Sequence, residues 1–168
     1  ELKCNTSGQN YEDAIRQYKF ERDYKTRLLK FKAGCLAHFA MDLNEVYMCT
    51  NLKGKSSFFL PFNKGCGVGI HSGKGNPHNE NGINVSYMWE DILKKDTVLY
   101  LIDKIIFLQK ETKKDPDTGK RVTKETLIFP RYHQFNAVRK LVADVVEHHS
   151  EKNYLIEHSA GSGKTNTI

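Results

Sequence analysis

Residues 154–165 read YLIEHSAGSGKT, a short apolar run followed at once by a glycine-rich loop that ends in Lys164 and Thr165. Glycines in such a loop let consecutive backbone N–H groups converge on phosphate oxygens. The lysine can reach the β- and γ-phosphates, and the hydroxyl of the threonine can bind Mg²⁺. The sequence therefore predicts a strand followed by a nucleotide-binding loop.

The predicted nucleotide site begins with the loop residues Gly161, Ser162, Gly163, Lys164 and Thr165, with Thr165 also expected as a ligand of the magnesium ion. The full Walker A pattern has a glycine six residues before the lysine, where this chain has His158. The alternative interpretation is a glycine-rich turn before an ordinary helix, which the strand and the Gly-Lys-Thr ending disfavour.

Arg131 and Gln134 extend the predicted nucleotide site. They belong to Arg131-Tyr132-His133-Gln134, and Gln134 lies 30 residues before Lys164, at the start of an amphipathic helix expected over 132–148. A glutamine side chain has both a donor and an acceptor, so it can match the edge of an adenine base. The alternative for Gln134 is a solvated residue in the first turn of a helix.

The opening tripeptide Glu1-Leu2-Lys3 indicates a second chemistry. In a strand, residues i and i+2 project from one face, so Glu1 and Lys3 would share a site while Leu2 enters the core. Glu1 can bind Mg²⁺, and Lys3 can orient a water or offset phosphate charge, as in a metal-dependent nuclease. The alternative is coincidence, because about one such tripeptide is expected by chance among so many lysines. This site also needs an aspartate upstream of Glu1.

Composition places the chain among soluble globular proteins. It has 168 residues, a net charge of +6, 39% hydrophobic and 27% charged residues, which excludes collagen-like, low-complexity and wholly disordered classes. No apolar run approaches the ~20 residues that cross a bilayer, and Cys4, Cys35, Cys49 and Cys66 show no zinc spacing. We expect a cytoplasmic protein with reduced thiols and no membrane contact. The mild positive charge permits contact with phosphate backbones without demonstrating it.

The pattern of apolar and turn residues predicts the order of elements. The expected elements are a helix at 12–22, a hairpin of strands 35–41 and 46–51, an extended segment at 58–62, a surface loop over 54–82, a helix holding Met88, Trp89 and Leu93, a second helix with Val98, Ile102, Ile105 and Leu108 on one face, a polar linker over 110–125 and the helix 132–148. Gln17, on the first helix, could reach towards Glu1 and Lys3, or could be an ordinary exposed residue. The linker carries five interleaved cations, Lys113, Lys114, Lys120, Arg121 and Lys124, which favour a solvated segment over a DNA contact.

The motifs together resemble a known family, the restriction (motor-nuclease) subunit of Type I restriction-modification enzymes. The resemblance rests on Glu1-Leu2-Lys3, Glu12-Asp13-Ala14-Ile15-Arg16-Gln17-Tyr18, Phe59-Leu60-Pro61-Phe62-Asn63, Tyr87-Met88-Trp89-Glu90, Phe129-Pro130-Arg131-Tyr132-His133-Gln134 and residues 153–165. In that family His158 is the expected residue before Ser159.

The resemblance implies an α/β fold: a restriction-endonuclease-like (PD-(D/E)xK) mixed sheet with flanking helices, then the first helix and strand of a RecA-like P-loop domain. It implies that residues 1–112 are the C-terminal part of the nuclease domain, 113–128 a linker and 129–168 the beginning of the motor domain. It also implies catalytic roles for Glu1 and Lys3, with Glu1 as a metal ligand. Gln17 would match the glutamine of a Gln-x-x-x-Tyr motif, whose tyrosine position is here Glu21.

The implied activity is ATP-dependent translocation and Mg²⁺-dependent cleavage of duplex DNA, in a complex with methylation and specificity subunits. The abrupt ends suggest a fragment, which we expect to be inactive alone. Two alternatives stay open at this point. One is a superfamily 2 helicase or translocase without nuclease activity, and the other is a non-catalytic docking module of residues 1–128 with loop 54–82 as its contact surface.

Overall fold

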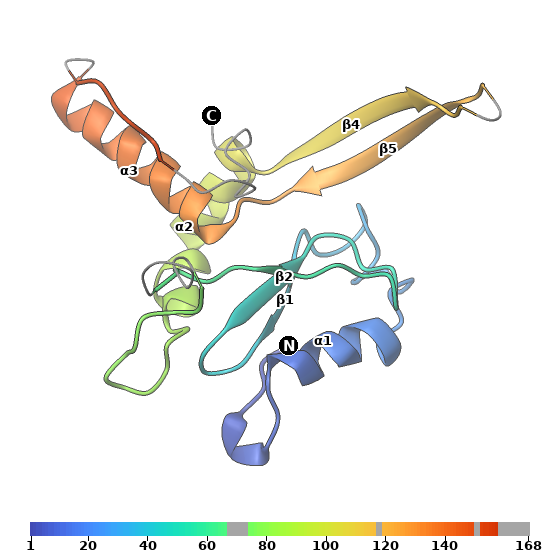
Figure 1. Ribbon diagram of the computed structural model, residues 1–168, viewed down its shortest axis with the longest axis horizontal. Helices are drawn as coiled ribbons and strands as arrows, with labels where there is room; N and C mark the ends of the chain where they lie inside the picture. The colour runs from blue at the N-terminus through green and yellow to red at the C-terminus, as the bar shows by residue number, and fades with distance from the viewer. Residues whose placement is uncertain (67–73, 117–118, 150–151, 158–168) are drawn as a thin grey trace.

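The computed structural model describes residues 1–66, 74–116, 119–149 and 152–157, and mixes helices with small sheets (Figure 1). The elements in chain order are the 3₁₀ turn η1 (Asn5–Ser7), helix α1 (Tyr11–Phe20), strands β1 (His38–Met41), β2 (Val46–Cys49) and β3 (Leu60–Pro61), the π-helical turn η3 (Met88–Ile92), helix α2 (Lys95–Tyr100), the π-helical turn η4 (Leu101–Ile105), strands β4 (Phe107–Lys114) and β5 (Arg121–Ile128), and helix α3 (Tyr132–His148). The assignments to a restriction-endonuclease-like sheet and a RecA-like domain stay predictions.

The first sheet has the order β1-β2-β3, with antiparallel neighbours. The expected hairpin is confirmed, and its strands are shorter than the sequence pattern indicated. Asp42 closes the turn, because its Oδ1 atom accepts hydrogen bonds from the backbone N–H groups of Asn44 (2.7 Å) and Glu45 (2.9 Å). Leu2 forms an isolated parallel bridge with Met41, which adds the opening tripeptide to the outer edge of β1.

Helix α1 covers one side of this sheet and confirms the first expected helix. Asn10 caps it: its side-chain oxygen accepts from the N–H groups of Glu12 and Asp13, and the Asp13 carboxylate accepts from the Asn10 N–H. Such a reciprocal cap satisfies donors that a helix start leaves unpaired. Ala14 and Tyr18 are buried in a small cluster with Ala40, Cys49 and Leu52.

The larger core joins the first sheet to the segments before and after the β4–β5 hairpin. Its buried residues are Met41, Val46, Met48, Phe62, Val85, Tyr87, Met88, Ile92, Leu101, Tyr132 and Phe135. The rings of Phe62 and Tyr132 meet edge to face at 5.9 Å, which is a favoured aromatic geometry. The helical segments expected around residues 88 and 98 pack on this core, together with the start of α3, through Met88, Ile92 and Leu101. The expected apolar faces are corrected in part, because Trp89, Leu93 and Ile102 are 45%, 53% and 48% exposed.

The segment expected to be a polar linker is instead a regular antiparallel hairpin. All eight residues of β4 pair with β5, from Phe107 opposite Ile128 to Lys114 opposite Arg121. The predicted turn at 115–119 is present, with the Gly119 N–H donating to the Asp115 carbonyl oxygen (2.9 Å) and Gly119 at φ 65°. Leu108, expected on a helix face, lies in β4.

The sequence did not indicate strands because both faces of this hairpin are largely polar and exposed, so no apolar alternation marks them. The domain division at 113–128 stays a prediction, although the larger core holds residues from both sides of it.

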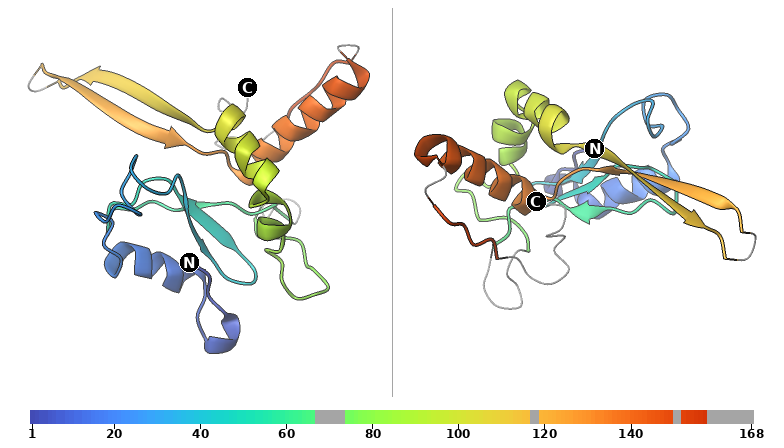
Figure 2. Two further views of the ribbon diagram at one scale, coloured as in Figure 1. Left: turned by 180° about the vertical axis from the view of Figure 1, so that it is seen from behind. Right: turned by 90° about the horizontal axis from the view of Figure 1, so that it is seen from above.

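Helix α3 matches the expected bounds and, like the β4–β5 hairpin, extends away from the three-stranded sheet (Figure 2). The strand expected at 154–156 is not formed, since residues 152–157 have no regular structure and Leu155 is 92% exposed. A strand needs a neighbouring strand for its backbone groups, and among the described residues none pairs with this segment. No helix in the described part of the chain is both long and apolar enough to span a membrane.

Candidate active site

Glu1 and Lys3 lie on the same side of the segment that pairs with β1. The Lys3 N–H donates to the Met41 carbonyl oxygen (2.8 Å), and the Met41 N–H donates to the Glu1 carbonyl oxygen (3.0 Å), as in a parallel ladder. The Lys3 Nζ atom is 3.4 Å from Glu1 Oε1, and the two side chains are 8% and 20% exposed. The expected shared face is therefore present, and the catalytic role of the two residues stays a prediction.

Leu2 does not enter the core, which corrects one expectation. Its side chain is 59% exposed. The Tyr18 hydroxyl of α1 contacts the Glu1 nitrogen, and Glu1 and Lys3 contact each other, so alternation directs Leu2 to the other side of the tripeptide. None of the described elements buries that side.

Arg22, just beyond the end of α1, completes a charged trio. Its Nη2 atom is 2.9 Å from Glu1 Oε2, while Lys3 approaches the other carboxylate oxygen. Partial burial tends to raise the pKa of the Glu1 carboxyl. The hydrogen bond from Arg22 and the neighbouring positive charges outweigh this effect and hold that pKa below its ordinary value. Glu1 is thus a carboxylate kept in its charged form.

Tyr18 contacts the Glu1 backbone, and His38 packs against the Tyr18 ring. The Glu1 backbone nitrogen donates to the Phe39 carbonyl oxygen (2.8 Å) and to the Tyr18 hydroxyl (3.3 Å). His38 is 4% exposed, and its ring meets the Tyr18 ring edge to face at 5.8 Å. Burial, followed by the nearby amino group, lowers the pKa of His38, so the imidazole is neutral at pH 7. Its Nε2 atom is buried with no hydrogen-bond partner among the described residues.

Gln17 projects from the middle of α1, and its Oε1 atom is also buried without a hydrogen-bond partner in the described part of the chain. The hydrogen bonds and ion pairs of Glu1 and Lys3 found among the described residues do not include it. The structure therefore gives Gln17 an unused acceptor without showing the expected approach to the tripeptide.

The donor set fits a magnesium ion in a limited way. Among the described residues there is no group of three or more His, Cys, Asp or Glu side chains that could hold a metal. Glu1 supplies one charged carboxylate, and Mg²⁺ is often held by one or two carboxylates, several waters and the phosphates of its substrate. Thr165, the second predicted ligand, lies outside the described residues, as do Gly161, Ser162, Gly163 and Lys164.

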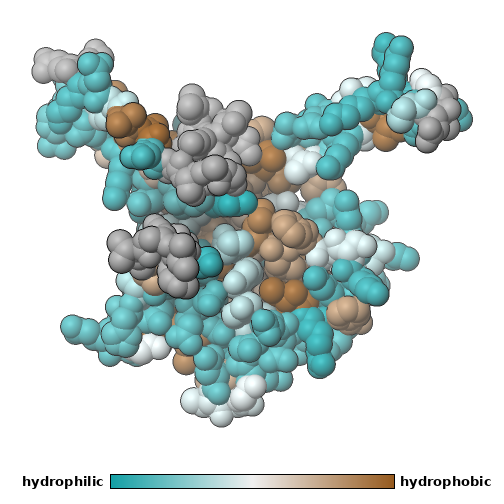
Figure 3. Space-filling model, viewed as in Figure 1, coloured by the Kyte–Doolittle hydropathy of each residue, from teal (hydrophilic) through white to brown (hydrophobic). Residues whose placement is uncertain are grey.

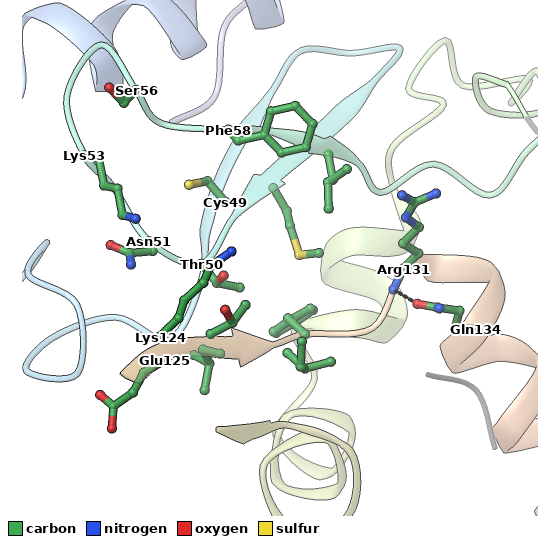
Figure 4. A pocket seen from close by; sticks show the side chains of 16 residues that line it. Cys49, Thr50, Asn51, Lys53, Ser56, Phe58, Lys124, Glu125, Arg131 and Gln134 are labelled. Carbon is green, nitrogen blue, oxygen red and sulfur yellow. Dashed lines mark hydrogen bonds between the residues drawn. The ribbon is translucent and has the colours of Figure 1, made fainter. Parts of the chain in front are cut away.

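Arg131 and Gln134 line a cavity of about 410 Å³ between the β2–β3 region and β5 (Figure 4). Gln134 is 5% exposed, and its Oε1 atom accepts the Arg131 backbone N–H at 2.7 Å. It is therefore not the solvated first-turn residue of the alternative interpretation. Lys53 and Lys124 line the same cavity. The sequence pattern indicates Lys124 only as one cation of the expected linker, and it does not indicate Lys53, which lies far from Arg131 along the chain.

Comparison with known proteins adds one relative. The chain is similar to a protein of Methanocaldococcus jannaschii named "Putative type I restriction enzyme MjaVIIIP endonuclease subunit". The two are 31% identical over 103 residues, which cover 54% of this chain and 9% of that protein. This chain thus spans less than a tenth of the curated relative that it matches. No protein-family model and no solved structure matches the chain.

Sequence reasoning had selected Glu1, Lys3 and Gln17. It missed Arg22 and Tyr18, which contact Glu1, and His38, which packs against the Tyr18 ring. Arg22 follows the end of α1, and only the fold shows that it reaches Glu1.

Proposed function

We propose that this chain carries part of the nuclease site of a type I restriction endonuclease subunit, and that Glu1 and Lys3 act in Mg²⁺-dependent hydrolysis of DNA phosphodiesters. The observation that carries the proposal is the 3.4 Å approach of the Lys3 ammonium to the Glu1 carboxylate on a segment paired with β1. The similarity to a relative named as an endonuclease subunit supports the same class of activity.

The residues of the site have separable roles. Lys3 is 7% exposed, so its charge acts in a region with little water, where an ammonium stabilises the negative charge that develops on a phosphate during hydrolysis. Arg22 is half exposed and contacts the Glu1 carboxylate, so it keeps Glu1 ionised and orients it. A bound Mg²⁺ would polarise the phosphoryl oxygens and lower the pKa of an attacking water.

We extend the proposal to nucleotide binding at the other end of the chain. Arg131 and Gln134 would contact the base of ATP, and Gly161, Ser162, Gly163, Lys164 and Thr165 would hold its phosphates and Mg²⁺. ATP hydrolysis would drive translocation of duplex DNA in a complex with methylation and specificity subunits. The Gln134 side chain supports the base contact, since it is held in place at the cavity edge by its bond to Arg131.

The test compares two variants of the complete subunit that contains this chain. Lys3→Ala should abolish DNA cleavage and leave ATP hydrolysis unchanged, whereas Lys164→Ala should abolish both. Lys104→Ala, which removes an exposed lysine of η4, is the matched control and should change neither activity. Cleavage at the normal rate by the Lys3 variant would sink the nuclease assignment and leave a motor protein.

A further inference from the structure

The β4–β5 hairpin is a two-stranded ribbon that projects from the rest of the described chain (Figures 1 and 2). Its two strands pair over eight residue pairs. Among the described residues, no third strand pairs with them. Both of its faces are exposed beyond the base. Figure 3 shows hydrophilic side chains along this arm. A ribbon of this length that packed against nothing would be marginally stable by itself, which raises the question of what covers it.

One face of the outer ribbon combines hydroxyls with cations. Residues directly opposite in an antiparallel pair project from the same face, and so do residues two apart along each strand. Thr112 opposite Thr123 and Lys114 opposite Arg121 therefore share a face. The two threonine hydroxyl oxygens are 3.0 Å apart, which agrees with this register.

Lys114 and Arg121 are like charges placed directly opposite each other, an arrangement that destabilises a hairpin. Carboxylates elsewhere on the ribbon are already paired with other cations. Glu125, nearer the base of the same face, is 2.5 Å from Lys32 and 3.4 Å from Lys110. Glu111, on the opposite face, is 3.6 Å from Lys113.

The connecting turn holds Asp115, whose backbone N–H donates to the Lys120 carbonyl oxygen, and Asp117, which lies outside the described residues. The four side chains of the outer face itself include no carboxylate. Within the described ranges, no ion pair to Lys114 or Arg121 is found, so the positive charge of this face suits an anionic partner.

We propose that this outer face, consisting of Thr112, Lys114, Arg121 and Thr123, binds the phosphate backbone and groove of a DNA duplex. The major groove is about 12 Å wide and admits a two-stranded ribbon. Lysine, arginine and threonine side chains are typical donors to phosphate oxygens. The inference rests on the proposed function only for the choice of DNA over other polyanions, and it assigns the contact to an element that the nuclease residues do not touch.

The experiment measures binding of the 168-residue chain to a short fluorescein-labelled DNA duplex of mixed sequence, by anisotropy, over about 50 to 200 mM salt. The double variant Lys114→Gln, Arg121→Gln should bind several-fold more weakly. The slope of log K against log salt should fall by about 1.8, because each lost phosphate contact removes about 0.9. Replacing both cations should also leave the hairpin folded, since it removes their mutual repulsion.

The matched control is Arg16→Gln, Lys140→Gln, which removes one exposed arginine and one exposed lysine from α1 and α3. It changes the net charge equally and should preserve most of the affinity. Equal weakening by both double variants would mean that only net charge matters and would overturn the assignment. So would absence of duplex binding, or equally tight competition by polyglutamate or by single-stranded DNA.

Failure here is distinguishable from failure of the nuclease proposal. In the complete subunit, Lys3→Ala should abolish cleavage without changing duplex affinity, while the ribbon variant should lower duplex affinity. Loss of affinity in the ribbon variant, together with unaffected cleavage in Lys3→Ala, would support the ribbon contact and reject the nuclease site.

Discussion

The Arg139 guanidinium holds the Asp91 carboxylate with two parallel hydrogen bonds, Nη1 to Oδ1 at 2.6 Å and Nη2 to Oδ2 at 2.8 Å. Planar bidentate contacts of this kind are among the stronger polar interactions in proteins. Arg139 also lies 4.8 Å from the centre of the Phe135 ring. The contact joins η3 to α3, two elements separated in the sequence by the whole β4–β5 hairpin.

Replacing Asp91 by Asn should destabilise the chain by about 1 kcal/mol or less, because both side chains stay partly in water. The hydrogen bond from Arg139 outweighs partial burial and lowers the pKa of the Asp91 carboxyl. The ionised Asp91 carboxylate therefore adds to the free energy of unfolding above the pKa of an unfolded aspartate, about 3.9. This added stability is lost as the pH falls through the lower pKa of the folded state. Urea unfolding at several pH values checks this: the difference between wild type and Asp91→Asn should shrink in acid. A constant difference would contradict the assignment.

Phe62→Ala should destabilise the chain by about 3–5 kcal/mol, because the side chain is completely buried and its removal leaves a cavity. The Phe62 ring contacts Phe39, Phe129 and Tyr132. The lost packing should therefore destabilise the first sheet and the start of α3 together. The measurement is thermal unfolding followed by circular dichroism. Phe58→Ala, at a position 74% exposed, is the control and should change stability by less than about 0.5 kcal/mol. Two separate transitions, with only one shifted, would show that the core is not shared.

Arg22→Ala should raise the pKa of the Glu1 carboxyl towards its ordinary value, since Arg22 supplies the hydrogen bond that opposes the effect of burial. In the wild type, stabilisation by the depressed Glu1 pKa is present at neutral pH and is lost as the pH falls through the folded value. Titration of the Glu1 carboxyl carbon by NMR in the 168-residue chain gives the pKa directly. Arg27→Ala, an exposed arginine in the following loop, is the control. An unchanged Glu1 titration in the Arg22 variant would remove Arg22 from the site.

Gln134→Glu separates the structural role of this side chain from its proposed role at adenine. Glutamate keeps the oxygen that accepts the Arg131 N–H, and its charge is favoured at a helix N-terminus, but burial of a carboxylate at a side chain that is 5% exposed should lower stability. It lacks the amide donor that an adenine edge requires. ATP affinity of the complete subunit, measured by calorimetry, should therefore fall about tenfold or more. Normal ATP affinity in the folded variant would leave Gln134 as a helix cap only.

Local signals predict α1, α3 and the first hairpin. Apolar residues at helical spacing after a turn-rich loop predict α1, and the long apolar periodicity of residues 132–148 predicts α3. The β4–β5 hairpin resembles a linker in sequence because polar residues occupy both of its faces. The strand at 154–156 was expected because its residues are apolar, but no described strand lies beside it, and Leu155 stays exposed.

The amino-acid sequence alone determined that a carboxylate and an amine stand two residues apart in Glu1-Leu2-Lys3, and that strand geometry would place them on one face. Tertiary structure alone decided that Arg22 and Tyr18 meet Glu1, that His38 lies buried beside Tyr18, and that α3 closes the same core as β2. The physical reason is the range of the interactions. Caps and periodicity act over a few residues, whereas contacts such as Glu1 with Tyr18, 17 positions apart, or Asp91 with Arg139, 48 positions apart, depend on how buried apolar surfaces fold the chain back on itself.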